Sequence, residues 1–232
     1  MSQRRISPES GDAAFALVEA TTAQVTRFLA AHIAERAANG LGGIAFLTGP
    51  TRAGKSLVGI RLAKALRRRR LPVAIALPAV VREDIVPGRI VSAQGRRSIA
   101  HRFGDSGAIQ KIFERAGVVI IDEVQFTPEP LWESVEAAVR DHAARGGWSV
   151  LLGMLYASDR TTFPLSARLR AHATVAIALT AVCAVCGRPN AIYSQRLLHG
   201  KPAPATLPFL LGPSDAITYE PRCTACHILD GG

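Results

Sequence analysis

The stretch GPTRAGKS, Gly49 to Ser56, has glycines five residues apart, followed by a lysine and a hydroxyl. This spacing is typical of a phosphate-binding loop, in which backbone N–H groups close around phosphate oxygens. Lys55 would place its charge on the β- and γ-phosphates of ATP, and the Ser56 hydroxyl would hold Mg²⁺. A glycine-rich turn without a ligand is the alternative, but an apolar run before the loop and a helical pattern after it favour nucleotide binding. The expected cofactor-binding residues are Gly49, Pro50, Thr51, Arg52, Ala53, Gly54, Lys55 and Ser56.

Two carboxylates stand at the end of a second apolar stretch, VVIIDEVQF. Asp122 lies where a phosphate-loop protein keeps its metal-associated carboxylate. Glu123 follows directly, and adjacent residues of a strand point to opposite faces. One acid can therefore serve the metal while the other orients or deprotonates a nucleophile. That nucleophile is water in an ATPase and a substrate hydroxyl in a kinase, and the local chemistry does not separate the two.

All four cysteines of the chain fall in two Cys-x-x-Cys pairs, with 36 residues between the inner cysteines. Four thiolates form a closed tetrahedral site that suits structural Zn²⁺, with redox pairs or free thiols as the alternative. Zinc would contribute on the order of 10 kcal/mol to a small module and would tether the Pro- and Gly-rich stretch 197–217. The expected ligands are Cys183, Cys186, Cys223 and Cys226.

Two further groups of residues can be interpreted either as functional or as ordinary surface residues. The run KALRRRR, ending at Arg70, can be a nucleic-acid patch or the solvated end of a helix. His172, His199 and His227 lie near or within the cysteine module. Because four cysteines already fill a tetrahedral site, we expect these histidines on the surface.

The apolar pattern predicts the elements that position these groups. Strands are expected at 44–49, 71–81, 118–121, 148–155 and 173–180, and helices at 12–37, 56–70 and 128–147. Short continuous apolar strands that alternate with helices indicate a parallel sheet covered on both faces. We therefore expect an α/β fold of the P-loop NTPase (RecA-like) class. From about residue 181 the composition changes to cysteine, glycine and proline. The expected parts are therefore a helical extension (1–40), a nucleotide-binding domain (41–180) and a zinc-binding module (181–232).

Composition limits the location and the partners of the chain. The net charge of +10 suits a polyanion, whether nucleotide, nucleic acid or an acidic surface. No run of 18 apolar residues exists, so no membrane span is expected. The first residues lack the apolar core of a signal peptide. We therefore expect cytoplasmic residence, where cysteines are thiols or metal ligands rather than disulfides.

Taken in order, the phosphate loop, IDEVQF, CAVCG and CTAC resemble the thymidine kinase family of the zinc-containing type. The resemblance runs from about Gly43 to Cys226. Shorter stretches agree with it: ALPAVVRED, RIVSAQG, LTAVCAVCGRPNAIYSQRL and TYEPRCTAC. No single piece decides the matter, but their order and spacing together are specific.

The resemblance implies transfer of the γ-phosphate of Mg-ATP to the 5′-hydroxyl of thymidine, with structural Zn²⁺ anchoring a loop, the lasso, that closes over the nucleoside. It also implies a homo-oligomer, commonly a tetramer. Glu123 matches the family's proton acceptor, and Arg82 matches an arginine that faces the transferred phosphate. The other residues carried over are Lys55, Ser56, Asp122 and Gln125 for the nucleotide and metal, and Phe126 and Tyr219 for the nucleoside.

Departures from the family pattern gather in the parts that recognise the nucleoside. Thr51 replaces a methionine, the sequence GMLYASDRTTF replaces a Gly-Leu-Asp-x-Asp-Phe stretch, and LGPSDAITY replaces paired glycines in the lasso. A divergent kinase for another nucleoside therefore stays open, as do a zinc-ribbon ATPase that depends on nucleic acid and a relative that only binds nucleotide.

Overall fold

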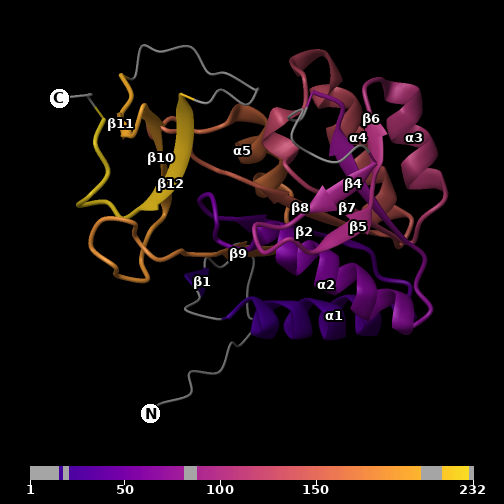
Figure 1. The fold of residues 1–232 in the computed structure, drawn as a ribbon. Coiled ribbons are helices and arrows are strands. Elements are labelled where there is room, and N and C mark those ends of the chain that lie inside the picture. Colours follow the sequence, from indigo (N-terminus) through magenta and orange to yellow (C-terminus); the bar gives the residue numbers. More distant parts are fainter. Residues whose placement is uncertain (1–15, 18–20, 81–87, 205–215, 230–232) are drawn as a thin grey trace.

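A seven-stranded parallel sheet forms the centre of the computed structural model, which describes residues 16–17, 21–80, 88–204 and 216–229 (Figure 1). The strands lie in the order β1-β9-β2-β8-β7-β3-β6. The predicted parallel sheet is confirmed, with each of the five predicted strands in it. The bounds are β1 (Ala16–Leu17), β2 (Gly43–Thr48), β3 (Val73–Pro78), β6 (His101–Phe103), β7 (Val118–Ile121), β8 (Trp148–Gly153) and β9 (Val175–Ala178).

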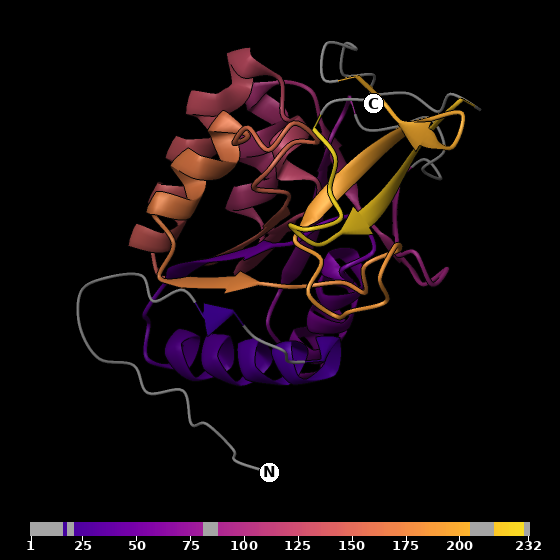
Figure 2. The same ribbon diagram turned by 90° about the vertical axis from the view of Figure 1, so that its left-hand side faces the viewer.

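Helices cover both faces of this sheet (Figures 1 and 2). The alternation of side chains along β2 shows why: Ala45 and Leu47 belong to one buried cluster, and Ile44 and Phe46 belong to the other. The first cluster packs under α1 (Thr22–Ala38) and α2 (Lys55–Arg68), and the second under α3 (Ser106–Glu114), α4 (Trp132–Ala144) and α5 (Pro164–Ala171). Among the described residues, no helix is long and apolar enough to cross a bilayer.

Helix α1 begins later than the sequence predicts. Thr21 caps it: the Thr21 Oγ1 accepts from the Gln24 N–H (3.3 Å), and the Gln24 Oε1 accepts from the Thr21 N–H (2.7 Å). This capping box fixes the start of the helix at Thr22. The prediction of helix from residue 12 is wrong at Ala16–Leu17, which pair with β9 as a parallel edge strand. The rest of the segment between residues 12 and 20 lies outside the described residues.

A second, antiparallel sheet follows the main one along the chain. It consists of β10 (Tyr193–Leu198), β11 (Lys201–Pro202) and β12 (Ile217–Arg222), with β10 in the middle. The sequence suggested a small module here but not its strands. A hairpin of β4 (Arg89–Val91) and β5 (Arg97–Ile99) and the 3₁₀ turns Val124–Phe126 and Glu129–Leu131 complete the described elements. The division of the chain at residues 40 and 180 stays a prediction.

Candidate active site

The phosphate loop joins β2 to α2 at the carboxyl edge of the sheet. Lys55 is the first residue of α2 and is buried, and its Nζ donates to the carbonyl oxygens of Gly49 (2.8 Å) and Pro50 (2.9 Å). Burial lowers the pKa of Lys55, while the negative charges of Glu123 and Asp122 act in the opposite direction. The loop thus holds a cation beside two acids.

Helix α1 supports this loop directly. Gly54 has a φ of 90°, and a Cβ on it would lie 2.6 Å from the Thr22 Cγ2. Both the conformation and the space therefore require glycine at this position. Arg61 on α2 donates from Nη1 to the Thr22 Oγ1 (3.0 Å). The start of α1 therefore packs against the phosphate loop, a role that the sequence alone did not suggest.

Asp122 follows β7 and is 2% exposed. Burial and then the negative charge of Glu123 raise the pKa of Asp122 to about 7, against the opposing effects of a hydrogen bond with Ser56 and the charge of Lys55. Among the described residues, no group hydrogen bonds to the Asp122 Oδ1. A buried carboxylate oxygen without a partner, on a side chain beside the Ser56 hydroxyl and the Lys55 charge, matches the oxygen ligands that Mg²⁺ prefers. Asp122 and Ser56 therefore fit the metal role predicted for them.

Glu123 is held in place by Gln125. The Gln125 Nε2 donates to the Glu123 Oε2 (2.5 Å), and the Gln125 Oε1 accepts from the Met154 N–H (3.1 Å). Glu123 itself has a φ of 54°, in the left-handed region that side chains rarely adopt. Strain of this kind persists where the surrounding structure enforces it and is common at active sites. Gln125, predicted as a nucleotide contact, is in this structure the residue that orients Glu123.

Substitution of Asp122 with asparagine is expected to stabilise the protein above pH 7 in the absence of metal and nucleotide. The folded-state pKa of Asp122, about 7, exceeds its ordinary value of 3.8, so the folded protein binds more protons than the unfolded chain between these values. Stability therefore falls as the pH rises through this window, and the neutral asparagine removes that loss. We expect Tm above pH 7 to rise by at least about 2–4 °C, measured by thermal unfolding at a series of pH values.

The exposed Asp141 supplies the control for this measurement, as Asp141→Asn. A parallel pH dependence of Tm in Asp122→Asn and the wild type would show that the buried carboxylate is not the cause.

The second sheet touches the phosphate loop. The Thr51 N–H donates to the Ser194 Oγ of β10 (2.8 Å), and the Ser194 hydroxyl donates to the Met154 sulfur (3.4 Å). Neither Ser194 nor Met154 was predicted, because a single polar residue in a strand and one methionine carry no sequence signal. This contact brings residues that are 143 positions apart in the chain to one place.

The remaining predicted residues lie around this contact or outside the described residues. Tyr219 on β12 pairs with Arg196, two residues beyond Ser194 on β10, so Tyr219 and Ser194 share a face of the second sheet. Phe126 is half-buried and lies edge-on to Phe163, with ring centroids 6.1 Å apart. Arg82, predicted to face the transferred phosphate, lies outside the described residues.

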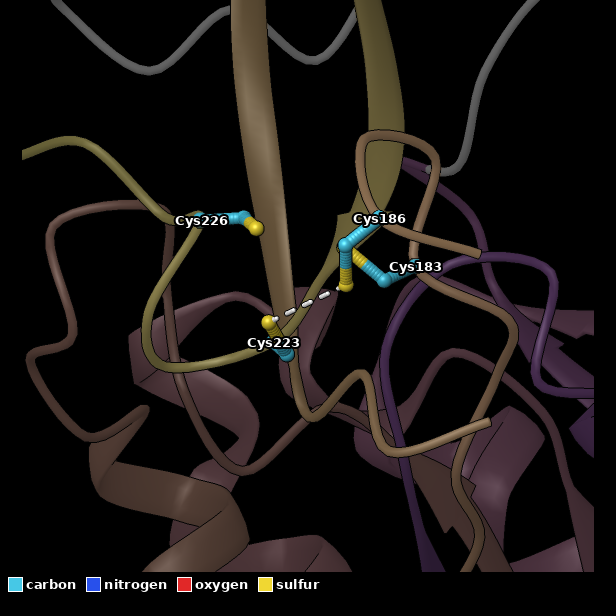
Figure 3. Close-up of side chains that lie close together, drawn as sticks. All are labelled: Cys183, Cys186, Cys223 and Cys226. Carbon is cyan, nitrogen blue, oxygen red and sulfur yellow. Dashed lines mark hydrogen bonds between the residues drawn. The ribbon is translucent and has the colours of Figure 1, made fainter. Parts of the chain in front are cut away.

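The four cysteines meet at one point, as Figure 3 shows. Their sulfur atoms all lie within 4.8 Å of one another, and the Sγ atoms of Cys186 and Cys223 are 3.8 Å apart. Four ligands at a Zn–S distance of about 2.3 Å in a tetrahedron place their sulfurs about 3.8 Å apart. The cluster therefore fits the predicted structural zinc ion.

The surroundings of the four cysteines also shift the pKa values of their thiols. Burial tends to raise the pKa of Cys183, but hydrogen bonds from the backbone N–H groups of Cys186, Cys223 and Val185 outweigh it and lower the pKa to about 6. The pKa of Cys226 is raised, chiefly by its hydrogen bond with Cys223. Since adjacent thiolates repel one another, a divalent cation is the natural counter-charge of this cluster.

The loop after β8 locks the second cysteine pair in place. Arg160 donates to the carbonyl oxygens of Thr224 (3.2 Å) and His227 (3.2 Å) and to the His227 Nδ1 (3.4 Å), and its guanidinium lies over the Tyr193 ring at 4.9 Å. The prediction that His227 lies on the surface is wrong: it is buried against Tyr193, because Arg160 and the β10 strand cover it. His172 and His199 are exposed, as predicted.

Truncation of Arg160 to alanine is expected to loosen the cysteine module. The change leaves the carbonyl oxygens of Thr224 and His227 without their charged donor, and hydrogen bonds to charged groups contribute about 1.5–3 kcal/mol. We expect the free energy of unfolding to fall by about 2 kcal/mol, measured by urea titration, and zinc to transfer faster to a chromogenic chelator. Arg188→Ala, at an exposed position beside the first cysteine pair, is the control. Equal rates of zinc transfer in the two variants would contradict the role of Arg160.

The sheet, its phosphate loop and the acids after β7 together define a P-loop NTPase fold. The strand that enters the loop, β2, lies between β9 and β8, which places the loop near the middle of the carboxyl edge. Among solved structures, the genome packaging NTPase of Sulfolobus turreted icosahedral virus 2 aligns with 60% of this chain and 75% of its own, at 14% identity and a TM-score of 0.38.

The sequence comparisons are more specific. The chain belongs to the thymidine kinase family, whose pattern, described as "Thymidine kinase", matches residues 42–227. The four-cysteine cluster supports the zinc-containing type. A thymidine kinase of Thermococcus kodakarensis is 39% identical over 48% of this chain and 54% of its own length. A thymidine kinase of Pyrobaculum aerophilum is 34% identical over 62% of its length, and one of Deinococcus deserti is 33% identical over 81% of this chain and 95% of its own. Among the first relatives, the chain thus spans about half to three fifths of their length.

Proposed function

We propose that this protein is an ATP-dependent thymidine kinase, which transfers the γ-phosphate of ATP to the 5′-hydroxyl of thymidine with Glu123 as the base. The observation that carries the proposal is the Glu123 carboxylate, fixed by Gln125 beside a phosphate loop. Nucleotide binding alone does not require a second, separately oriented acid, whereas deprotonation of a hydroxyl does. Membership of the thymidine kinase family supports thymidine as the nucleoside.

The phosphate loop supplies positioning and charge. Its backbone N–H groups and the N-terminus of α2 attract the phosphates, and Lys55 neutralises part of the charge on the transferred group. Mg²⁺ would neutralise part of the phosphate charge when bound, and Asp122 and Ser56 are the residues that would hold it. Phosphoryl transfer needs little beyond such positioning and charge neutralisation, so these residues account for most of the catalysis.

The second sheet supplies the nucleoside side of the site in this proposal. Ser194 touches the phosphate loop at Thr51, and Tyr219 shares its face of the sheet. Phe126, one turn after the base, would pack against the nucleoside. Arg82 would neutralise the transferred phosphate. The cysteine cluster adjoins the C-terminal end of β12 and would hold the second sheet in place. The second sheet would then exclude water from the reacting phosphate.

A panel of nucleosides tests the proposal. The zinc-loaded protein is incubated with Mg-ATP and thymidine, deoxyuridine, deoxycytidine or deoxyguanosine, and the products are separated by chromatography. We expect thymidine monophosphate as the main product. A different monophosphate would overturn the substrate but keep the kinase, while ADP without any monophosphate would favour the ATPase reading.

The chain is proposed to act as a homo-oligomer in the cytoplasm. The family resemblance supports a tetramer, and four clustered thiols support a reducing compartment. Light scattering coupled to size-exclusion chromatography measures the assembly, and a monomeric mass would contradict it.

A further inference from the structure

Two arginines of the run at the end of α2, Arg67 and Arg70, line a groove at the amino edge of the main sheet, opposite the edge that bears the phosphate loop. The groove has a volume of about 630 Å³. Its floor is the segment 71–74, which leads into β3, and its walls are the last turns of α2 and α3. Helix α2 has 14 residues and separates the groove from Lys55 by about 20 Å. The groove is therefore distinct from the candidate active site.

Four full positive charges line this groove. Arg67 and Arg70 come from the α2 side, and Lys111 and Arg115 come from α3. No carboxylate is among the lining residues that the structure describes, and His101 is the other titratable group there. The neighbouring groove between α3 and α4, of about 660 Å³, contains Glu114 and Asp141 beside a single Arg145, so carboxylates outnumber full cations there. Of these two grooves, the one at the end of α2 is lined by cations without a carboxylate.

Arg70 occupies a backbone position that favours glycine. Its φ is 62°, the Leu71 N–H donates to the Leu66 carbonyl (3.2 Å), and the Arg70 N–H donates to the Arg67 carbonyl (2.9 Å). This is the Schellman ending of a helix, in which the left-handed residue is usually glycine. The chain keeps an arginine here against its conformational preference, and the side chain lines the groove.

The negative ends of the helices do not cancel these cations. The C-terminus of a helix carries about half a negative charge, and two helices end at the groove. Their sum of roughly one negative charge is small against four positive ones. The α2 carbonyls of Leu66 and Arg67 are also satisfied by the Schellman bonds. The groove is therefore a net attractor of anions.

The lining also indicates which anion fits. Its side chains apart from the cations and His101 are aliphatic, so no amide, hydroxyl or carboxylate side chain lines the groove to read the edge of a base. Apart from the single imidazole of His101, no aromatic ring among the described lining residues offers a stacking surface for unpaired bases. Cations from two separate helices match phosphates spaced along a backbone. We propose that this groove binds the phosphate backbone of double-stranded nucleic acid, without sequence preference.

Salt-dependent binding tests the proposal. A fluorescein-labelled DNA duplex of about 20 base pairs is titrated with the zinc-loaded protein at salt concentrations from about 50 to 200 mM, and anisotropy gives the affinity. Four phosphate contacts predict a slope of log K against log salt of about −3.6, or a loss of about 10²-fold across this range. The double variant Arg67→Ala/Arg70→Gly is expected to halve the slope.

Two controls separate the groove from the overall charge and from folding. Arg27→Ala/Arg140→Ala removes the same charge from exposed positions on α1 and α4 and is expected to keep the slope. Arg70→Gly alone suits the left-handed position, so its Tm should equal or exceed that of the wild type while its slope falls by about 0.9. Thymidine phosphorylation should not change in either groove variant, because the groove lies apart from Lys55.

Other outcomes would overturn the proposal. Equal slopes for the groove variant and its charge-matched control would mean that binding follows the net charge only. Tighter binding of a single strand of the same length would assign the surface to unpaired nucleic acid. Binding of inorganic tripolyphosphate without binding of the duplex, measured by calorimetry, would assign it to a small phosphate ligand.

Discussion

Replacement of Glu123 by glutamine is expected to lower kcat for thymidine phosphorylation by about 10²–10⁴-fold, the usual contribution of general-base catalysis. Glutamine keeps the size of the side chain, and its Oε1 can still accept from the Gln125 Nε2, as the Glu123 Oε2 does now at 2.5 Å. The geometry of the site should therefore survive while the proton acceptor is lost. KM for thymidine and the affinity for Mg-ATP should stay within about threefold, because this acid acts on the transition state and not on ground-state binding.

Initial rates at saturating ATP measure this loss, with a fluorescent ATP analogue to check nucleotide binding. Glu114→Gln, at an exposed position of α3, removes the same charge elsewhere and should keep the full rate. A Glu123→Gln enzyme that retains more than about a tenth of the wild-type kcat would remove Glu123 as the base. A loss of ATP affinity with it would instead assign Glu123 to the metal.

The main sheet could be predicted from the sequence because its strands are buried on both faces. Such strands read as short continuous apolar runs, and VVII at Val118–Ile121 was placed to the residue. The phosphate loop could be predicted for a related reason. Its glycines, lysine and hydroxyl are local in sequence, so their spacing alone defines the chemistry.

The elements that were missed depend on neighbours that are distant in sequence. The edge strand Ala16–Leu17 is two residues long and exists because β9 offers it a partner. In the strands of the hairpin β4–β5, Ile90 is the one buried residue, so no apolar pattern marks it. Helix α3 did carry a signal, since the Asp105 Oδ1 accepts from the Ala108 N–H (2.8 Å) as an N-cap. An aspartate before a nine-residue helix is simply too common to be decisive alone.

The residues of the candidate site likewise fall into those that a sequence motif predicts and those that only the fold brings together. Lys55, Ser56, Asp122 and Glu123 were predicted from spacing, and the structure brings them together. Ser194 and Met154 were not, because Ser194 contacts the phosphate loop across 143 residues and Met154 contacts Ser194 across 40, and neither contact forms a sequence motif. His227 was placed on the surface by an argument about zinc ligands, which says nothing about the Arg160 side chain that covers it. Motifs thus predict chemistry, while the fold decides which ordinary residues stand beside it.

Removal of zinc is the second large effect expected. In Cys223→Ser, phosphorylation of thymidine should fall by at least about 10²-fold in kcat/KM, because structural zinc contributes on the order of 10 kcal/mol to a module of this kind. Among the described residues, the buried cluster at the cysteine site consists of Cys183, Ala191 and Cys223, so the apolar core beside the metal is small. Cys223 follows β12 directly, and β12 pairs with the β10 strand that bears Ser194. Loss of the metal should therefore release the side of the site that faces the nucleoside.

The phosphate loop lies on the main sheet, so nucleotide binding should outlast the zinc site. We expect the affinity of Cys223→Ser for a fluorescent ATP analogue to change by less than about tenfold, since Lys55 bonds to its own loop and not to the second sheet. Chelation of zinc from the wild type should reproduce the effect, and restored zinc should reverse it. Thr224→Ala, at an exposed position in the same cysteine pair, is the control and should keep both zinc and activity. A zinc-free protein that phosphorylates thymidine at the wild-type kcat/KM would show that the cysteine cluster does not position the second sheet. Loss of nucleoside turnover together with ATP binding would show that the cluster supports the whole fold and not one side of the site.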